Sequence, residues 1–472
     1  MMIYTINNLF INSNDKTKKI PTQVTVNGWV RSNRNSKKVG FLDLNDGSSI
    51  NNLQVVYDPN LENTNNLTNV TTGSAVTITG NLILTPNAKQ PFELKVITAT
   101  VYNICANDYP IQKKEHTNEF LREHAHLRVR TNTFLSLFRI RAQVSWSIHN
   151  FFHNNQFIYL HSPLITANDA EGAGENFIVT TITNDKYEKD FFGKKASLTV
   201  SGQLNAEAYA QSLQKVYTFG PTFRAEKSNT TRHAAEFWMV EPEFTFSNLQ
   251  DNIILAQKLI KTVIRDVLNN CNSELKFLEQ KQETKNEQSL IEKLEKIADF
   301  KSDFKVITYT EVIELLLNAQ KKGKKFEFNE IKWGIDLQSE HERYLCEEIT
   351  KQPTFVINYP QTIKAFYMKL NPIDSNYPQQ KTVAAMDLLV PGIGELIGGS
   401  VREDNYEQLL KNKTQFKIEG NDLQWYFDLR KYGYAPSAGF GLGLERFLMF
   451  ITGINNIRDV IPFPRTPNNL LF

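Results

Sequence analysis

Two regions of the chain show different spacings of apolar residues. From Gln23 to about Ile104, short alternating segments are separated by Asn, Asp and Gly turns, which predicts a small barrel of about five strands. A polar, charged segment with one proline follows the barrel. We therefore assign residues 1–108 to a barrel domain and residues 109–130 to a linker.

Residues 131–472 combine helical and strand patterns. An amphipathic helical pattern begins at Thr131 and stops before the strand-like segment FIYLHSPLIT, and further strand patterns follow. A charged region at about 251–350 has mainly helical spacing and resembles an insertion. The strand segments read as antiparallel neighbours, and the sequence contains neither a P-loop motif nor a Gly-rich dinucleotide-binding turn. We expect an α+β domain rather than a doubly wound parallel sheet.

The composition excludes some classes of protein. With 41% hydrophobic and 22% charged residues, and no run of about 18 apolar residues, the chain is typical of a globular protein without a membrane span. The N-terminal segment lacks a secretory signal pattern, so we expect a cytoplasmic location. Three widely spaced cysteines argue against a disulfide framework and a Cys-rich zinc site. A net charge of +2 means that nucleic acid would have to bind at local patches.

The segment TFRAEKSNTTRHAAEFWMVEPEF places many charges on two predicted strands. Side chains alternate faces along a strand, so Phe237, Glu241 and Glu243 share a polar face, and the opposite face with Trp238 is expected to be core. Arg224 lies on the polar face of the preceding strand. A guanidinium binds carboxylate and phosphate bidentately while an aromatic ring stacks on a base, so this floor fits an anionic ligand with a planar base. The alternative is a ladder of salt bridges on a solvated sheet face.

Three segments in a fixed order carry a resemblance. A long amphipathic helix leads to a strand with Pro163, then comes FRAE with its charged loop, and then GLGLER with Arg446 at the start of an apolar helix. Alone, Arg446 also fits a solvated helix face, and Pro163 marks only a strand edge. Together these segments resemble the three motifs of class II aminoacyl-tRNA synthetases. The barrel is similar to the anticodon-binding OB-fold of the subclass that serves aspartate, asparagine and lysine.

Finer strings resemble the asparaginyl members of this subclass, namely EGAGENF, LTVSGQLNAE, RHAAEFWMVEPE, AAMDLLVPGIGELIGGSVRE and VIPFPRTP. Aspartyl members are expected to have Pro at the position of Gly202 and Lys at that of Ala206. A cationic Lys beside the substrate side chain favours a carboxylate, whereas acceptors such as Glu207 or Glu241 favour the NH2 of a carboxamide. The nearest alternative is a non-discriminating aspartyl-tRNA synthetase; a non-catalytic tRNA-binding paralogue and an asparagine synthetase of the same fold are the others. One departure is Ser437, because the family commonly has His in this turn.

The resemblance implies an asparagine–tRNA ligase that activates L-asparagine with ATP and transfers it to tRNA(Asn), with Mg2+ on the phosphates. The implied catalytic residues are Arg224, which would bridge the asparagine carboxylate and the α-phosphate, and Arg446. The implied ATP-binding residues are Arg224, Glu226, Arg232, His233, Phe237, Glu395 and Arg446. The implied asparagine-binding residues are Glu171, Ser201, Gln203, Glu207, Glu241 and Arg402. Asp387 and Glu395 would hold Mg2+, and ordinary turn or edge carboxylates are the alternative for these two.

The resemblance also implies two macromolecular contacts. On the barrel, Arg31, Phe41 and Gln54 would bind the tRNA anticodon by stacking and by hydrogen bonds to base edges. A core Phe and a strand-edge Gln are the alternative for Phe41 and Gln54. The first motif builds the dimer interface in this family, so we expect a homodimer with the helix from Phe134 and with Pro163 at the two-fold axis.

Overall fold

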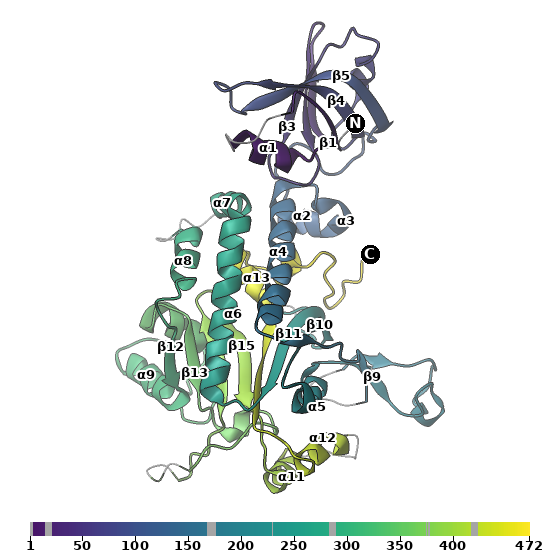
Figure 1. Cartoon of the computed structure of the whole chain (residues 1–472). Helices are drawn as coiled ribbons and strands as arrows, with labels where there is room; N and C mark the ends of the chain where they lie inside the picture. The colour runs from purple at the N-terminus through teal and green to yellow at the C-terminus, as the bar shows by residue number, and fades with distance from the viewer. Residues whose placement is uncertain are drawn as a thin grey trace. The chain divides into compact units, whose positions relative to one another are not determined.

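The computed structural model describes residues 3–14, 21–167, 176–228, 230–282, 289–373, 375, 378–416 and 423–472. The chain divides into two compact units, Met1–Phe138 and Arg139–Phe472 (Figure 1). Within the described ranges, no helix is long and apolar enough to cross a membrane.

Unit 1 contains a closed barrel with the strand order β1-β2-β3-β5-β4. The elements of this unit are α1 (Ile6–Asn14), β1 (Gln23–Asn35), β2 (Gly40–Asn45), β3 (Leu53–Tyr57), η1 (Asn65–Asn69), β4 (Ala75–Leu84), β5 (Phe92–Asn103), α2 (Asn118–Glu123), α3 (Ala125–Arg128) and the start of α4 (Asn132–Asn154). Every second residue of a strand enters one apolar core, as Val24 and Val26 do on β1. The barrel predicted from the alternation is therefore confirmed.

Unit 2 is built on an eight-stranded sheet with the order β12-β13-β14-β15-β16-β11-β10-β6. Its strands are β6 (Ile158–Tyr159), β10 (Lys215–Phe223), β11 (Glu236–Thr245), β12 (Lys305–Thr308), β13 (Thr354–Ile357), β14 (Ala385–Val390), β15 (Gly394–Val401) and β16 (Ser437–Gly443). The inner pairs run antiparallel, whereas the edge pairs β12–β13 and β10–β6 run parallel. The predicted α+β domain is confirmed, and its sheet is mixed rather than wholly antiparallel.

Helices pack on this sheet and bury its central strands. Contacts with the strands come from α5 (Gln203–Leu213), α6 (Leu249–Asn270), α10 (Ser339–Tyr344) and α13 (Leu444–Thr452). On α6, Ile253, Leu259, Ile260 and Val263 are buried at helical spacing, and this stripe meets β14, β15 and β16. As a result all six residues of β14 are buried.

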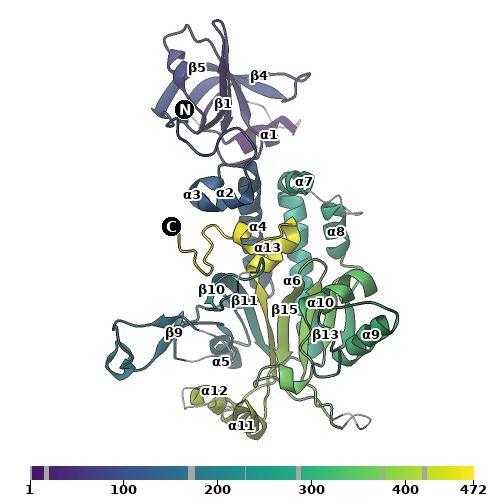
Figure 2. The same ribbon diagram turned by 180° about the vertical axis from the view of Figure 1, so that it is seen from behind.

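The region that we expected as a mainly helical insertion at about 251–350 is mainly helical and also belongs to the sheet. Besides α6 and α10 it contains α7 (Asn272–Gln280), α8 (Leu290–Ile297), α9 (Tyr309–Lys321) and the π-helical segment η3 (Leu345–Ile349). It supplies the edge strand β12, which pairs with β13. Helix α6 lies along the sheet in both views of the molecule (Figures 1 and 2).

Smaller elements complete unit 2. A separate sheet has the order β7-β9-β8, and two short helices with a 3-10 turn lie between β15 and β16 along the chain. These elements are β7 (Ile165–Thr166), β8 (Ile178–Val179), η2 (Tyr187–Lys189), β9 (Ala196–Leu198), η4 (Gln361–Ile363), α11 (Tyr406–Gln415), α12 (Gln424–Asp428), η5 (Leu429–Lys431) and α14 (Ile457–Val460). Helices α11 and α12 lie close to α5 at one end of the sheet (Figure 2).

Candidate active site

The predicted charged strand pair consists of β10 and β11. The two strands are antiparallel, with Thr222 opposite Phe237. Arg224 follows β10, where its backbone N–H donates to the Ala235 carbonyl at 3.0 Å. Its guanidinium lies 5.4 Å from the centroid of the Phe237 ring. The strand register thus brings the two floor residues together, as the sequence pattern indicated.

One prediction about the opposite face is wrong. Trp238 was expected in the core, but it is 38% exposed and packs against Phe219 with ring centroids 5.5 Å apart. The reason is the extent of pairing, because β16 joins β11 only from Met239 onward. From Val240 to the end of β11 every residue is buried.

Two arginines reach this floor from other elements. Arg446 in the first turn of α13 donates from Nη1 to the Glu395 carbonyl at 3.2 Å. Arg232, on the loop between β10 and β11, donates from Nη2 to the Gly392 carbonyl at 3.3 Å. Arg232 therefore contacts the turn that joins β14 and β15, and Arg446 contacts the start of β15.

The electrostatics of His233 show how close the cations are. Burial lowers its pKa, and Arg446, Arg224 and Arg232 lower it further, while Glu226 acts in the opposite direction. Three arginines thus lie close enough to His233 to affect its pKa. Their mutual repulsion is relieved when an anion binds between them, so the cluster fits a phosphate chain.

Two carboxylates converge next to these cations. A Cβ added at Gly398 would lie 2.8 Å from Glu395 Oε1 and 3.5 Å from Asp387 Oδ1, so both acids face one point on β15. Lys364 Nζ pairs with Asp387 Oδ2 at 2.5 Å. Glu342 on α10 is a further acid, which the sequence did not single out. Burial, and then the charges of Glu395 and Asp387, raise the pKa of Glu342 to about 7.

The donor set at this point suits Mg2+. In the described part of the chain, no group of three or more His, Cys, Asp or Glu residues is arranged to hold a metal ion by itself. Mg2+ usually takes one or two protein carboxylates and completes its coordination with water and substrate phosphate oxygens. Asp387 and Glu395 fit that mode, because they converge beside the cations that would hold the phosphates.

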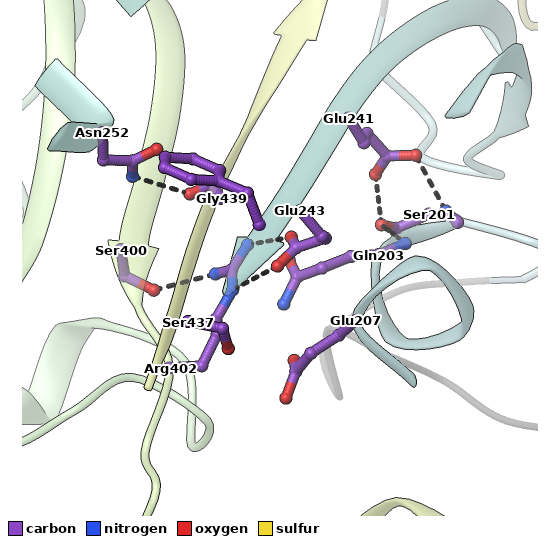
Figure 3. A network of polar contacts seen from close by, with 12 residues as sticks. Ser201, Gln203, Glu207, Glu241, Glu243, Asn252, Ser400, Arg402, Ser437 and Gly439 are labelled. Carbon is purple, nitrogen blue, oxygen red and sulfur yellow. Dashed lines mark hydrogen bonds and ion pairs between the residues drawn. The ribbon is translucent and has the colours of Figure 1, made fainter. Parts of the chain in front are cut away.

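The segment before α5 is hydrogen-bonded to Glu241 (Figure 3). Ser201 Oγ donates to Glu241 Oε1, and the backbone N–H of Gly202 donates to Oε2 at 2.9 Å. Thr218 Oγ1 donates to the same Oε2 at 3.0 Å. The Nε2 of Gln203 is buried and has no acceptor among the described residues. Glu241 is therefore occupied by protein donors, and Gln203 retains a donor for a ligand.

A buried ion pair lies beside Gln203. Arg402, directly after β15, donates from Nε to Glu243 Oε2 at 3.1 Å and from Nη2 to Oε1. Its Nη1 donates to Ser400 Oγ at 2.8 Å. Burial raises the pKa of Glu243 to about 7, and Arg402 acts in the opposite direction. Gln203 extends toward this pair (Figure 3). The alternation had placed Glu243 on the floor, but nothing in the sequence indicated its partner.

Glu207 on α5 is fully buried and accepts hydrogen bonds from Arg430, Tyr434 and Tyr426. Glu171 lies outside the described residues.

The three candidate anticodon residues lie on the first strands of the barrel. Phe41 on β2 is 39% exposed, which argues against a core role, and Gln54 Nε2 on β3 donates to Glu93 at 3.3 Å. Arg31 occupies the irregularity of β1 between Val30 and Ser32, and burial lowers its pKa. Arg34, which we had not selected, is the register partner of Phe41.

The candidate dimer residues differ in exposure. Phe134 is 1% exposed, and the guanidinium carbon of Arg128 lies 4.4 Å from the centroid of the Phe134 ring. Pro163 is exposed just after β6.

Comparison with known proteins adds independent evidence. Residues 117–467 match the family model described as tRNA synthetases class II (D, K and N), and residues 24–102 match the OB-fold nucleic acid binding domain. An asparagine–tRNA ligase of Mycoplasma mycoides subsp. mycoides is 55% identical, with 95% of this chain and 96% of that protein covered. The corresponding ligase of Clostridium beijerinckii is 49% identical over 99% of both chains. Among solved structures, asparaginyl-tRNA synthetase from Pyrococcus horikoshii complexed with asparaginyl-adenylate has a TM-score of 0.84 and 29% identity, covering 100% of this chain and 99% of that chain.

Proposed function

Because the chain belongs to the class II tRNA synthetases that serve aspartate, lysine and asparagine, we propose that it is an asparagine–tRNA ligase. In the first step, L-asparagine and ATP form asparaginyl-adenylate and diphosphate. In the second step, the asparaginyl group passes to the 3′ end of tRNA(Asn) and AMP is released. The observation that supports asparagine over aspartate as the substrate is the buried Arg402–Glu243 pair. Helix α5 has Ala206, whereas a cationic residue at that position would favour aspartate.

The floor of β10 and β11 supports the activation step. The Arg224 guanidinium bridges the asparagine carboxylate and the α-phosphate, so two anions that repel each other are held in reacting distance. Phe237 and Arg446 hold the adenine between them, and Glu226 accepts a hydrogen bond from its amino group. Arg232 and His233 bind the terminal phosphates. In support of these roles, burial lowers the pKa of His233, and the nearby charges of Arg446, Arg224 and Arg232 lower it further.

The pocket beyond the floor supports recognition of a neutral side chain. Glu243 offers an acceptor to the carboxamide NH2, while Arg402 donates to its carbonyl. A carboxylate in the same place would bring a second anion against Glu243, which costs more in a buried site than in water. The Ser201 hydroxyl oxygen and the Gln203 side-chain carbonyl accept hydrogen bonds from the α-ammonium group, and Glu241 holds Ser201 in place.

Asp387 and Glu395 would hold Mg2+, which would neutralise phosphate charge when ATP binds. The barrel binds the anticodon of tRNA(Asn) at Phe41, Gln54 and Arg31. We also propose a homodimer and a cytoplasmic location.

The test is ATP–diphosphate exchange with asparagine and with aspartate side by side. We expect exchange with asparagine and little with aspartate. Exchange with aspartate alone would overturn the proposal, and equal exchange with both would favour the non-discriminating aspartyl enzyme. Arg224→Ala is the control for contaminating activity, because it removes the residue that bridges the two reacting anions.

A further inference from the structure

Glu207 is the centre of a buried polar network behind the asparagine pocket. Its Oε1 accepts from Arg430 Nη2 at 2.6 Å and from the Tyr434 hydroxyl at 2.7 Å, and its Oε2 accepts from the Tyr426 hydroxyl at 2.7 Å. The Arg430 and Glu207 side chains have no exposed surface. A carboxylate with these three partners has little capacity left for a substrate, so its role has to act through its neighbours.

The network ends at the backbone that carries Arg402. Arg430 Nε donates to the Glu403 carbonyl at 2.9 Å. The Tyr434 hydroxyl and Ser437 Oγ lie 2.7 Å apart, and the Ser437 carbonyl accepts from the Arg402 backbone N–H at 2.8 Å. Two separate paths therefore lead from Glu207 to residues 402 and 403.

The same carboxylate fixes the other wall of the pocket. Glu207 lies one helical turn after Gln203 on α5, and Gln211 lies one turn further along the same face. Gln211 exchanges two hydrogen bonds with the backbone of Ala435, at 2.8 and 3.1 Å. Helix α5 thus holds the segment before β16 at two points, and Gln203 at its start extends toward Glu243 (Figure 3).

The charges near the pocket also depend on Glu207. The carboxylates of Glu207, Glu241 and Glu243 outnumber the guanidinium groups of Arg402 and Arg430. Glu241 is held by neutral donors, so its charge is not cancelled by a cation. An excess of negative charge in a buried region disfavours a further anion and leaves a carboxamide unaffected.

We propose that Glu207 is a positioning residue that determines asparagine specificity, because it holds Arg402 at a fixed place relative to Gln203 and maintains the negative charge that rejects aspartate. This inference rests on the proposed function. It predicts that Glu207 affects amino-acid recognition and leaves ATP recognition unchanged.

The experiment compares Glu207→Gln and Tyr434→Phe with two matched controls, Glu407→Gln on the exposed face of α11 and Tyr432→Phe at a side chain that is 79% exposed. The readout is KM and kcat of ATP–diphosphate exchange for asparagine, aspartate and ATP. We expect Glu207→Gln to raise the KM for asparagine about tenfold or more and to narrow the ratio of kcat/KM for asparagine over aspartate, as loss of a buried charged hydrogen bond does. Tyr434→Phe should produce a smaller change in the same direction, and the controls should match the wild type.

Two results would overturn the inference. One is an unchanged KM for asparagine in a Glu207→Gln protein with normal thermal unfolding. The other is an equal rise in KM for asparagine and ATP, which would indicate general damage. If Glu207→Gln does not fold, Tyr434→Phe and Ser437→Ala give the same test, because Tyr434 and Ser437 form the path from Glu207 to the Arg402 backbone. A failure of the proposed function itself would differ, because the wild-type chain would then show no exchange with asparagine.

Discussion

At the scale of single residues, the carboxylates of Glu241 and Glu243 on β11 are only two positions apart but have different kinds of hydrogen-bond donor. Glu241 accepts hydrogen bonds from a hydroxyl, a backbone N–H and a second hydroxyl, and all three donors are neutral. Glu243 is paired with the guanidinium of Arg402. Neutral donors hold a carboxylate in place without cancelling its charge, whereas a guanidinium cancels it. Glu241 therefore keeps an uncompensated negative charge in this buried region, whereas Glu243 holds the side chain of Arg402 in place.

A prediction at this scale concerns Phe41 on the barrel. Because its ring is 39% exposed, Phe41→Ala removes a stacking surface without opening the core. Loss of one stacked base should weaken tRNA binding by about 1–3 kcal/mol, which raises the KM for tRNA roughly 5- to 150-fold and leaves exchange with asparagine unchanged. Aminoacylation at varied tRNA concentration measures this. Tyr102→Ala, at another exposed aromatic of the barrel, is the control. An unchanged KM for tRNA would remove Phe41 from the anticodon site.

At the scale of elements, β16 shows how a glycine makes room for the site. Gly439 pairs with Glu243 across the sheet, and a Cβ there would overlap the Glu243 carboxylate and the Pro242 carbonyl oxygen. The pairing is close because β16 lies between β11 and β15, the two strands that lead to the Arg402–Glu243 pair. Without a side chain at Gly439, both strands can approach and the ion pair can form in a buried position.

We predict that Gly439→Ala lowers the free energy of unfolding by about 1–3 kcal/mol, the usual effect of overpacking a buried site. It should also raise the KM for asparagine, since Glu243 has to move away from Arg402. Gly443→Ala on the same strand is the matched control, because its Cβ would meet only Met239 Sδ, at 3.9 Å. Thermal unfolding of the two variants makes the comparison. Equal melting temperatures would contradict the close approach at Gly439.

The elements could be predicted from local patterns, but the partners of the buried charges could not. Strand alternation was sufficient for the barrel and for the floor with Arg224 and Phe237, because those contacts join neighbouring strands. Arg430 and Glu207 are 223 positions apart, and each alone has the pattern of a surface residue. Glu342 likewise becomes part of the site only when α10 packs on β14 and β15. Pairings of this kind depend on tertiary packing and have no periodic signal in the sequence.

At the scale of the whole molecule, unit 2 leaves apolar side chains exposed along one edge of its structure. The edge strand β6 and the small sheet expose Ile158, Tyr159, Ile165 and Ile178, each with more than two fifths of its surface free. Exposed apolar side chains on an edge strand are an aggregation hazard unless a partner covers them. A second copy of the chain is the partner that the proposed homodimer supplies.

We predict that Ile158→Glu separates this homodimer. A buried charge at a two-fold interface meets its own copy across the axis, so repulsion adds to the cost of desolvation. Sedimentation velocity should show twice the 54.3 kDa chain mass for the wild type and the single chain mass for the variant. Ile83→Glu, at a position on β4 of the barrel that is 41% exposed, is the control and should remain dimeric. A wild-type chain that sediments as a monomer at micromolar concentration would contradict the homodimer. A dimeric Ile158→Glu protein would show instead that the interface lies on another surface.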